Sequence, residues 1–153
     1  MLINIDYSNI KASLHLTSKV TVIDDLSGTG KTTLATAIYE SRQLNRINMT
    51  AYIDIADVPV IPEDVNIVVL DENAIVFLRK ERALVNLLKH NCYFVLITRS
   101  PLKELNYSHK SIYTLKYCND IYMLERKYDN YDYIPDTPSF IEDSKYFNNY
   151  VEV

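Results

Sequence analysis

The chain of 153 residues contains only two glycines, Gly28 and Gly30, and both lie in the stretch VIDDLSGTGKTTLA at residues 22–35. This stretch joins an apolar run, KVTVIDD, to a segment whose apolar residues have helical spacing. Glycine allows turns that a side chain would forbid and lets a ligand come close to the backbone. Because the free N–H groups and the positive dipole end of the next helix point to one spot, this context predicts a phosphate-binding loop.

The side chains of this loop suit a nucleotide with magnesium. Lys31 would place a positive charge on the outer phosphates, and the hydroxyl of Thr32 would bind Mg²⁺. The predicted nucleotide contacts are Ser27, Gly28, Thr29, Gly30, Lys31, Thr32 and Thr33. Asp25 stands where the phosphate-loop pattern has glycine, next to Asp24, and two carboxylates near a triphosphate weaken its binding unless they point away or contact Mg²⁺. The alternative is an ordinary strand-to-helix turn with a solvated Lys31.

Apolar strands and helical stretches alternate along the chain. The pattern predicts strands at residues 2–8, 12–18, 19–25, 51–57, 65–72 and 92–98, two more around a turn at Asn119 and Asp120, and helices at 31–46 and 74–90. Strands that alternate with helices indicate a parallel sheet with helices on both faces. The expected fold is therefore α/β, a three-layer sandwich with a mainly parallel central sheet, preceded by an N-terminal antiparallel strand pair.

Polar residues follow two of the buried strands. NIVVLDE brings Asp71 to the end of its strand, where it would bind Mg²⁺, and Glu72 would be the general base that polarises an attacking water. The alternative is a polar pair that caps the next helix. YFVLITRSP ends in Thr98, which would contact the outer phosphate, and Arg99, which would stabilise charge developing during transfer. For Arg99 the alternative is a surface residue before a proline turn.

GTGKTTLATAIY, IVVLDE and FVLITRS resemble the Walker A loop, the Walker B strand and the strand-ending arginine of P-loop NTPases of the additional-strand class, with local similarity to STAND (NB-ARC-like) ATPases. The resemblance covers residues 19–100. It implies that the strand ending at Thr98 lies between the loop strand and the aspartate strand. It assigns catalytic roles to Lys31, Glu72 and Arg99 and makes Thr32 and Asp71 the metal ligands. Residues 1–117 would form this NTPase-like domain, and residues 118–153 a strand plus an acidic, tyrosine-rich extension packed on the same domain.

Three functions are compatible with these motifs. The leading hypothesis is a small Mg²⁺-dependent nucleotide-binding protein, an ATPase whose nucleotide state controls a partner interaction, with GTP as the alternative nucleotide. The second is a binding or inhibitor protein that keeps the P-loop fold without hydrolysis, and the Asn, Ile, Lys and Tyr content suggests a phage or mobile-element origin. The third is a small-molecule kinase, although kinases of this superfamily generally lack the adjacent Asp-Glu pair.

The net charge of −4 comes mainly from the C-terminal segment, because residues 118–153 hold three basic and eight acidic residues. Tyrosine offers rigid apolar area and carboxylates pair with basic groups, so this segment predicts a protein partner. The alternative is an extension packed on the core with solvated charges. The acidic balance argues against general nucleic-acid binding. A homo-oligomer is a further hypothesis, because many such NTPases complete their site with a neighbour's arginine.

The remaining observations concern redox state and location. Cys92 and Cys118 are expected to be reduced, partly buried thiols, with a metal site or a disulfide as the alternative. The sequence has no leader pattern, and its most apolar stretch is interrupted by Asp71, Glu72 and Asn73 well short of a membrane span. We therefore expect a cytoplasmic protein without membrane contact.

Overall fold

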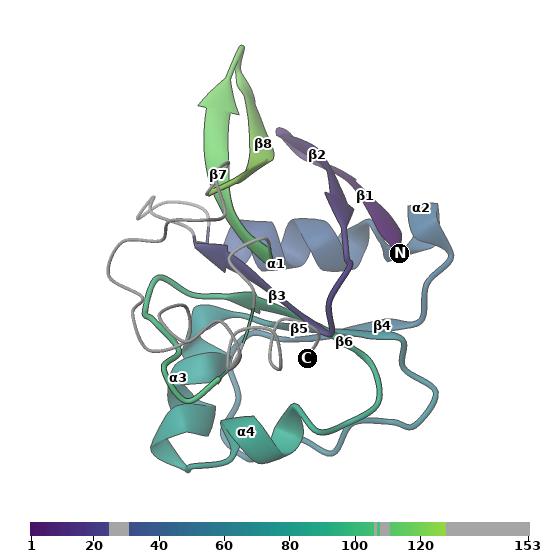
Figure 1. Ribbon diagram of the computed structural model, residues 1–153. Helices are drawn as coiled ribbons and strands as arrows, with labels where there is room; N and C mark the ends of the chain where they lie inside the picture. The colour runs from purple at the N-terminus through teal and green to yellow at the C-terminus, as the bar shows by residue number, and fades with distance from the viewer. Residues whose placement is uncertain (25–30, 106, 108–110, 128–153) are drawn as a thin grey trace.

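The computed structural model describes residues 1–24, 31–105, 107 and 111–127, with residues 31–33 described by their backbone alone (Figure 1). Its strands form one eight-stranded sheet in the order β1-β2-β8-β7-β3-β6-β5-β4. The strands are β1 Leu2–Tyr7, β2 Ile10–His15, β3 Val20–Asp24, β4 Met49–Tyr52, β5 Ile67–Leu70, β6 Tyr93–Ile97, β7 Ile112–Cys118 and β8 Ile121–Arg126. No helix of the described residues is long and apolar enough to cross a membrane.

The sheet is mixed and curled. Strands β7, β3, β6, β5 and β4 pair in parallel, whereas β1–β2 and β7–β8 are antiparallel hairpins. The first hairpin joins the sheet through β2 and β8, which pair in parallel at Ile10 and Tyr122. The N-terminal strand pair is therefore part of the main sheet rather than a separate element before it.

The expected three-layer sandwich is wrong, because the sheet bends into a half-barrel around one helix. Helix α1, Lys31–Glu40, contacts β1 at one edge of the sheet and β4 at the other. Figure 1 shows α1 between the β1–β2 part of the sheet and the part that holds β4, β5 and β6. Strand twist accumulates across eight strands, and burying α1 in the concave face uses that curvature.

Two apolar cores lie on the two sides of the curled sheet. Within β5, Ile67 and Val69 join the core around α1, whereas Val68 and Leu70 join the opposite core, as the two-residue period of a strand requires. All four residues are fully buried. The opposite core is covered by helices α3, Glu72–Lys80, and α4, Leu84–Leu87. A strand buried on both faces reads as a continuous apolar run, which is why β5 was predictable.

The helix predicted for residues 74–90 is two short helices instead. Helix α3 ends at Lys80, and Arg82 has a φ of 56°, in the left-handed region. A residue in this conformation ends a helix, and the chain restarts as α4 at Leu84. The helix expected at 31–46 is divided as well, because α1 ends at Glu40 and α2 spans Arg42–Asn45.

Strand β4 is shorter and earlier than the predicted strand at 51–57. It pairs residue by residue with β5, from Met49 beside Ile67 to Tyr52 beside Leu70. Because β5 ends at Leu70, residues 53–57 have no strand beside them to extend the ladder. The turn predicted at Asn119 and Asp120 is confirmed, and positive φ values of 52° and 66° at these residues suit a two-residue hairpin loop.

The edge strand β1 is covered by side chains from the end of α1 and from α2. The amide of Asn45 bonds both backbone groups of Asn4, with its Oδ1 accepting from the N–H and its Nδ2 donating to the carbonyl, each at 2.8 Å. The hydroxyl of Ser41 accepts from the N–H of Asp6 at 3.0 Å and donates to the carbonyl of Ala37. These side chains form hydrogen bonds with backbone groups of β1 that could otherwise pair with another strand.

The substitution Asn45→Ala should lower the free energy of unfolding and increase self-association. Two hydrogen bonds to the β1 backbone are lost, and at about 1 kcal/mol each the stability should fall by about 1–2 kcal/mol. Denaturant unfolding and sedimentation velocity measure the two effects. Asn86→Ala, at an exposed position of α4, is the matched control. Equal stability of the two variants would show that the Asn45 amide does not protect this edge.

Candidate functional site

Polar residues lie at the carboxyl ends of three neighbouring strands inside the sheet. Asp24 ends β3, Asp71 follows β5, and Thr98 follows β6. Strand β6 pairs with β3 on one side and with β5 on the other, so the predicted position of the Thr98 strand between the other two is confirmed. Because these strands are parallel, their carboxyl ends face the same edge, where α/β sheets commonly bind ligands.

The backbone fixes these strand ends. The N–H of Asp71 donates to the carbonyl of Tyr52, at the end of β4, at 3.0 Å. The N–H of Thr98 donates to the carbonyl of Ile23 in β3, also at 3.0 Å. Each polar residue is thus tied to the end of an adjacent strand, so its position is set by the sheet.

Asp71 is a deeply buried carboxylate with 2% exposure. It occupies the N-cap position of α3, yet its side chain makes no capping hydrogen bond to that helix. The alternative role that the sequence left open, helix capping by Asp71, therefore lacks its defining contact. Glu72 begins α3 and is half-buried, which places it directly beside Asp71 in the chain at the same edge.

Thr98 and Arg99 differ in burial. Thr98 is 3% exposed, and its Oγ1 accepts a hydrogen bond from the N–H of Ser100 at 3.1 Å, so this hydroxyl stabilises the turn after β6. Arg99 is exposed. The chain beyond is anchored by buried Leu102 and by a two-point ion pair, in which Arg79 of α3 donates to both carboxylate oxygens of Glu104 at 2.7 and 2.9 Å.

The glycine loop itself lies outside the described residues. This applies to the predicted contacts Ser27, Gly28, Thr29 and Gly30, to Asp25, and to the side chains of Lys31, Thr32 and Thr33. The flanking backbone is described: β3 spans Val20–Asp24, and α1 spans Lys31–Glu40 within the helix predicted for residues 31–46. The predicted protein-binding segment from residue 128 onward also lies outside the described part.

Asp24 has a partner that sequence reasoning missed. Its Oδ2 forms an ion pair with the ammonium of Lys127, and the Asp24 side chain is 10% exposed. The two residues are separated by 103 positions. No local pattern links them, because the contact depends on the β7–β8 hairpin pairing beside β3.

Possible metal ligands are sparse in the described part of the chain. Within these residues, no three His, Cys, Asp or Glu side chains come together as a metal site. Of the two predicted magnesium ligands, only Asp71 has a described side chain. A buried carboxylate that does not cap a helix is an oxygen donor of the type Mg²⁺ prefers, and Mg²⁺ commonly takes one or two carboxylates together with substrate phosphates.

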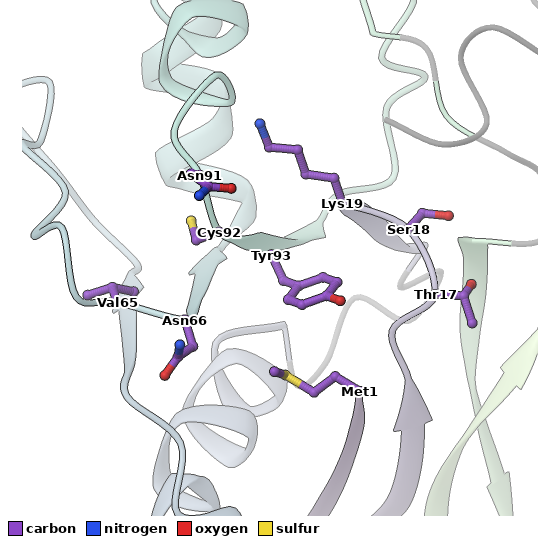
Figure 2. Close-up of a pocket in the computed structure, with 9 residues that line it drawn as sticks. All are labelled: Met1, Thr17, Ser18, Lys19, Val65, Asn66, Asn91, Cys92 and Tyr93. Atoms are coloured by element: carbon purple, nitrogen blue, oxygen red, sulfur yellow. The ribbon is translucent and has the colours of Figure 1, made fainter.

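A cavity of about 440 Å³ lies elsewhere in the fold, at the amino ends of the parallel strands. Figure 2 shows the Tyr93 ring near the centre of its lining residues, with Lys19 and Cys92 close by. Three of the lining residues directly precede parallel strands: Lys19 precedes β3, Asn66 precedes β5 and Cys92 precedes β6. The cavity is therefore at the opposite strand ends from Asp24, Asp71 and Thr98, and it is not the predicted nucleotide crevice.

Both cysteines are free thiols. Cys92 is partly buried as expected, whereas Cys118, at the tip of the β7–β8 hairpin, is exposed. Burial raises the pKa of the Cys92 thiol to about 11, and the positive charge of Lys19 opposes this shift. A raised pKa keeps Cys92 protonated near neutral pH, in its unreactive form.

The two thiols should therefore react at very different rates with iodoacetamide at pH 8. With its pKa raised from 9.0 to about 11, Cys92 has about a hundredth of the thiolate that it would otherwise have. Cys118→Ser, which keeps only Cys92, should be alkylated slowly, with a rate that rises until the pH reaches about 11. Cys92→Ser is the matched control and should react quickly. A plateau of the Cys92 rate below pH 9 would contradict the assigned burial effect.

Comparison with protein-family models, with curated proteins and with solved structures found no match for this chain. The features of this chain that bear on function are therefore the polar residues at the carboxyl ends of β3, β5 and β6 and the glycine-containing sequence between β3 and α1.

Proposed function

We propose that the chain is a small Mg²⁺-dependent nucleotide-binding protein of the P-loop NTPase type, which hydrolyses ATP and whose nucleotide state controls a protein partner. The observation that carries the proposal is Asp71, a carboxylate with 2% exposure at the end of β5 that does not cap α3. Carboxylate oxygens are ligands that Mg²⁺ takes together with substrate phosphates. Asp71 follows β5 at its carboxyl end, and the glycine sequence follows the carboxyl end of the parallel strand β3.

The strand order supports this proposal. The glycine sequence follows β3, Asp71 follows β5, and β6 with Thr98 lies between them. A phosphate group bound near the start of α1 would be on the same edge of the sheet as Asp71. Asp71 and Thr32 would hold Mg²⁺ there, and the ion would neutralise charge on the phosphates.

Each polar residue of this edge has a proposed role. Lys31 neutralises the outer phosphates, Thr32 and Asp71 hold Mg²⁺, and Glu72 removes a proton from the attacking water. Arg99, exposed at the start of the loop after β6, stabilises charge on the outer phosphate. The residues of the glycine loop supply backbone N–H donors.

The substitution Lys31→Ala should abolish most of the affinity for Mg²⁺-ATP. A hydrogen bond to a charged group contributes about 1.5–3 kcal/mol, so the dissociation constant should rise by about 10- to 150-fold. Isothermal titration calorimetry with ATP and with GTP in parallel measures this and reveals the base preference. Lys80→Ala, at the exposed end of α3, is the control and should bind as the wild type does. Absence of binding by the wild-type protein would overturn the proposed function.

The substitution Glu72→Gln tests hydrolysis separately from binding. Losing a general base lowers the rate of ATP hydrolysis by about 10²–10⁴, while Mg²⁺-ATP affinity should stay within a few-fold of the wild type. Steady-state phosphate release and calorimetry measure the two quantities. Glu81→Gln, at the C-cap of α3, is the control. Full hydrolysis by Glu72→Gln would show that Glu72 does not activate the water. ATP binding without any hydrolysis by the wild type would favour the alternative function, a P-loop protein that binds nucleotide without hydrolysing it.

A further inference from the structure

The ion pair between Asp24 and Lys127 joins the strand before the glycine loop to the end of the β7–β8 hairpin. Asp24 is the last residue of β3, and its register partner in β7 is Thr114. Lys127 directly follows β8, and its N–H donates to the carbonyl of Ile112, the first residue of β7, at 2.9 Å. The Lys127 backbone is therefore held beside β7, and its side chain reaches Asp24 in the neighbouring strand.

The position of Asp24 gives this pair an electrostatic consequence. The residue directly precedes the loop that the proposed function assigns to the phosphates. A buried carboxylate at this point would repel a polyphosphate, because salt and solvent screen buried charges much less than exposed ones. The Asp24 side chain is 10% exposed and that of Lys127 is 33% exposed, so solvent only partly shields the pair. Lys127 therefore cancels the negative charge of Asp24.

We propose that Lys127 is a positioning residue of the nucleotide site, and that nucleotide affinity depends on the docking of the β7–β8 hairpin end through the Asp24–Lys127 pair. This inference rests on the proposed nucleotide-binding function. With the pair intact, Asp24 is held toward Lys127 and is neutralised. With Lys127 withdrawn, its charge opposes the phosphates.

A charge-removal cycle tests the inference. The dissociation constant of Mg²⁺-ATP is measured by calorimetry for the wild type, Lys127→Met, Asp24→Asn and the double variant. Lys127→Met should weaken binding by about tenfold or more, because it leaves a buried carboxylate near the phosphates. Asp24→Asn should bind at least as tightly as the wild type, and the double variant should return to within about threefold of it. Lys116→Met removes a lysine of the same hairpin that pairs with Glu125, and it should change nothing.

The outcomes separate this inference from the proposed function. If the wild type binds Mg²⁺-ATP and Lys127→Met binds equally well, the inference is wrong and the nucleotide site stands. If the double variant stays as weak as Lys127→Met, Lys127 does not act through Asp24, and the inference is again wrong. If Lys127→Met does not fold, the double variant decides, since affinity near the wild type supports neutralisation and a tenfold loss overturns it. No binding by the wild type overturns both proposals.

Discussion

Burial of helix α1 inside the curled sheet is the constraint on which the rest of the structure depends. The helix contributes fully buried Leu34, Ala37 and Ile38 to the core on the concave face. A sheet with eight strands can cover one helix from two sides only if it bends, and α1 indeed meets both β1 and β4. The first strand and the last strand of the sheet are thus held in place by the same helix. The extensive apolar burial makes α1 and β3 fixed supports for the loop between them.

The sequence predicted which segments form strands and which form helices better than it predicted how these elements are arranged in space. The buried strands β3, β5 and β6 are continuous apolar runs, and the turn at Asn119 and Asp120 uses residues that tolerate positive φ. Curvature was not predictable, because it depends on twist summed over strands that are distant in sequence and on the hairpins adding to the same sheet. The interruption at Arg82 was missed because helical periodicity continues across it.

At the candidate site, the sequence could predict which residues end the strands but not what those residues contact. Asp71 and Thr98 follow apolar runs, so their position at one edge followed from parallel pairing. That Asp71 does not cap α3 and that the Thr98 hydroxyl accepts from Ser100 are side-chain facts with no sequence pattern. Lys127 could not be found at all, since it comes close to Asp24 only after β7 pairs with both β3 and β8.

The ion pair changes how the departure from the phosphate-loop pattern is interpreted. In the sequence, Asp24 and Asp25 stand as two adjacent carboxylates before a phosphate loop, which suggests strong repulsion of a triphosphate. In the folded chain, Asp24 has its counter-charge in Lys127, so its contribution to the field at that edge depends on tertiary structure rather than on loop sequence. The fields of two opposite charges in contact largely cancel at greater distances, so Asp24 repels a triphosphate less in the folded chain than its place in the sequence suggests. The electrostatics of the proposed site therefore depend on the hairpin at the far end of the described chain.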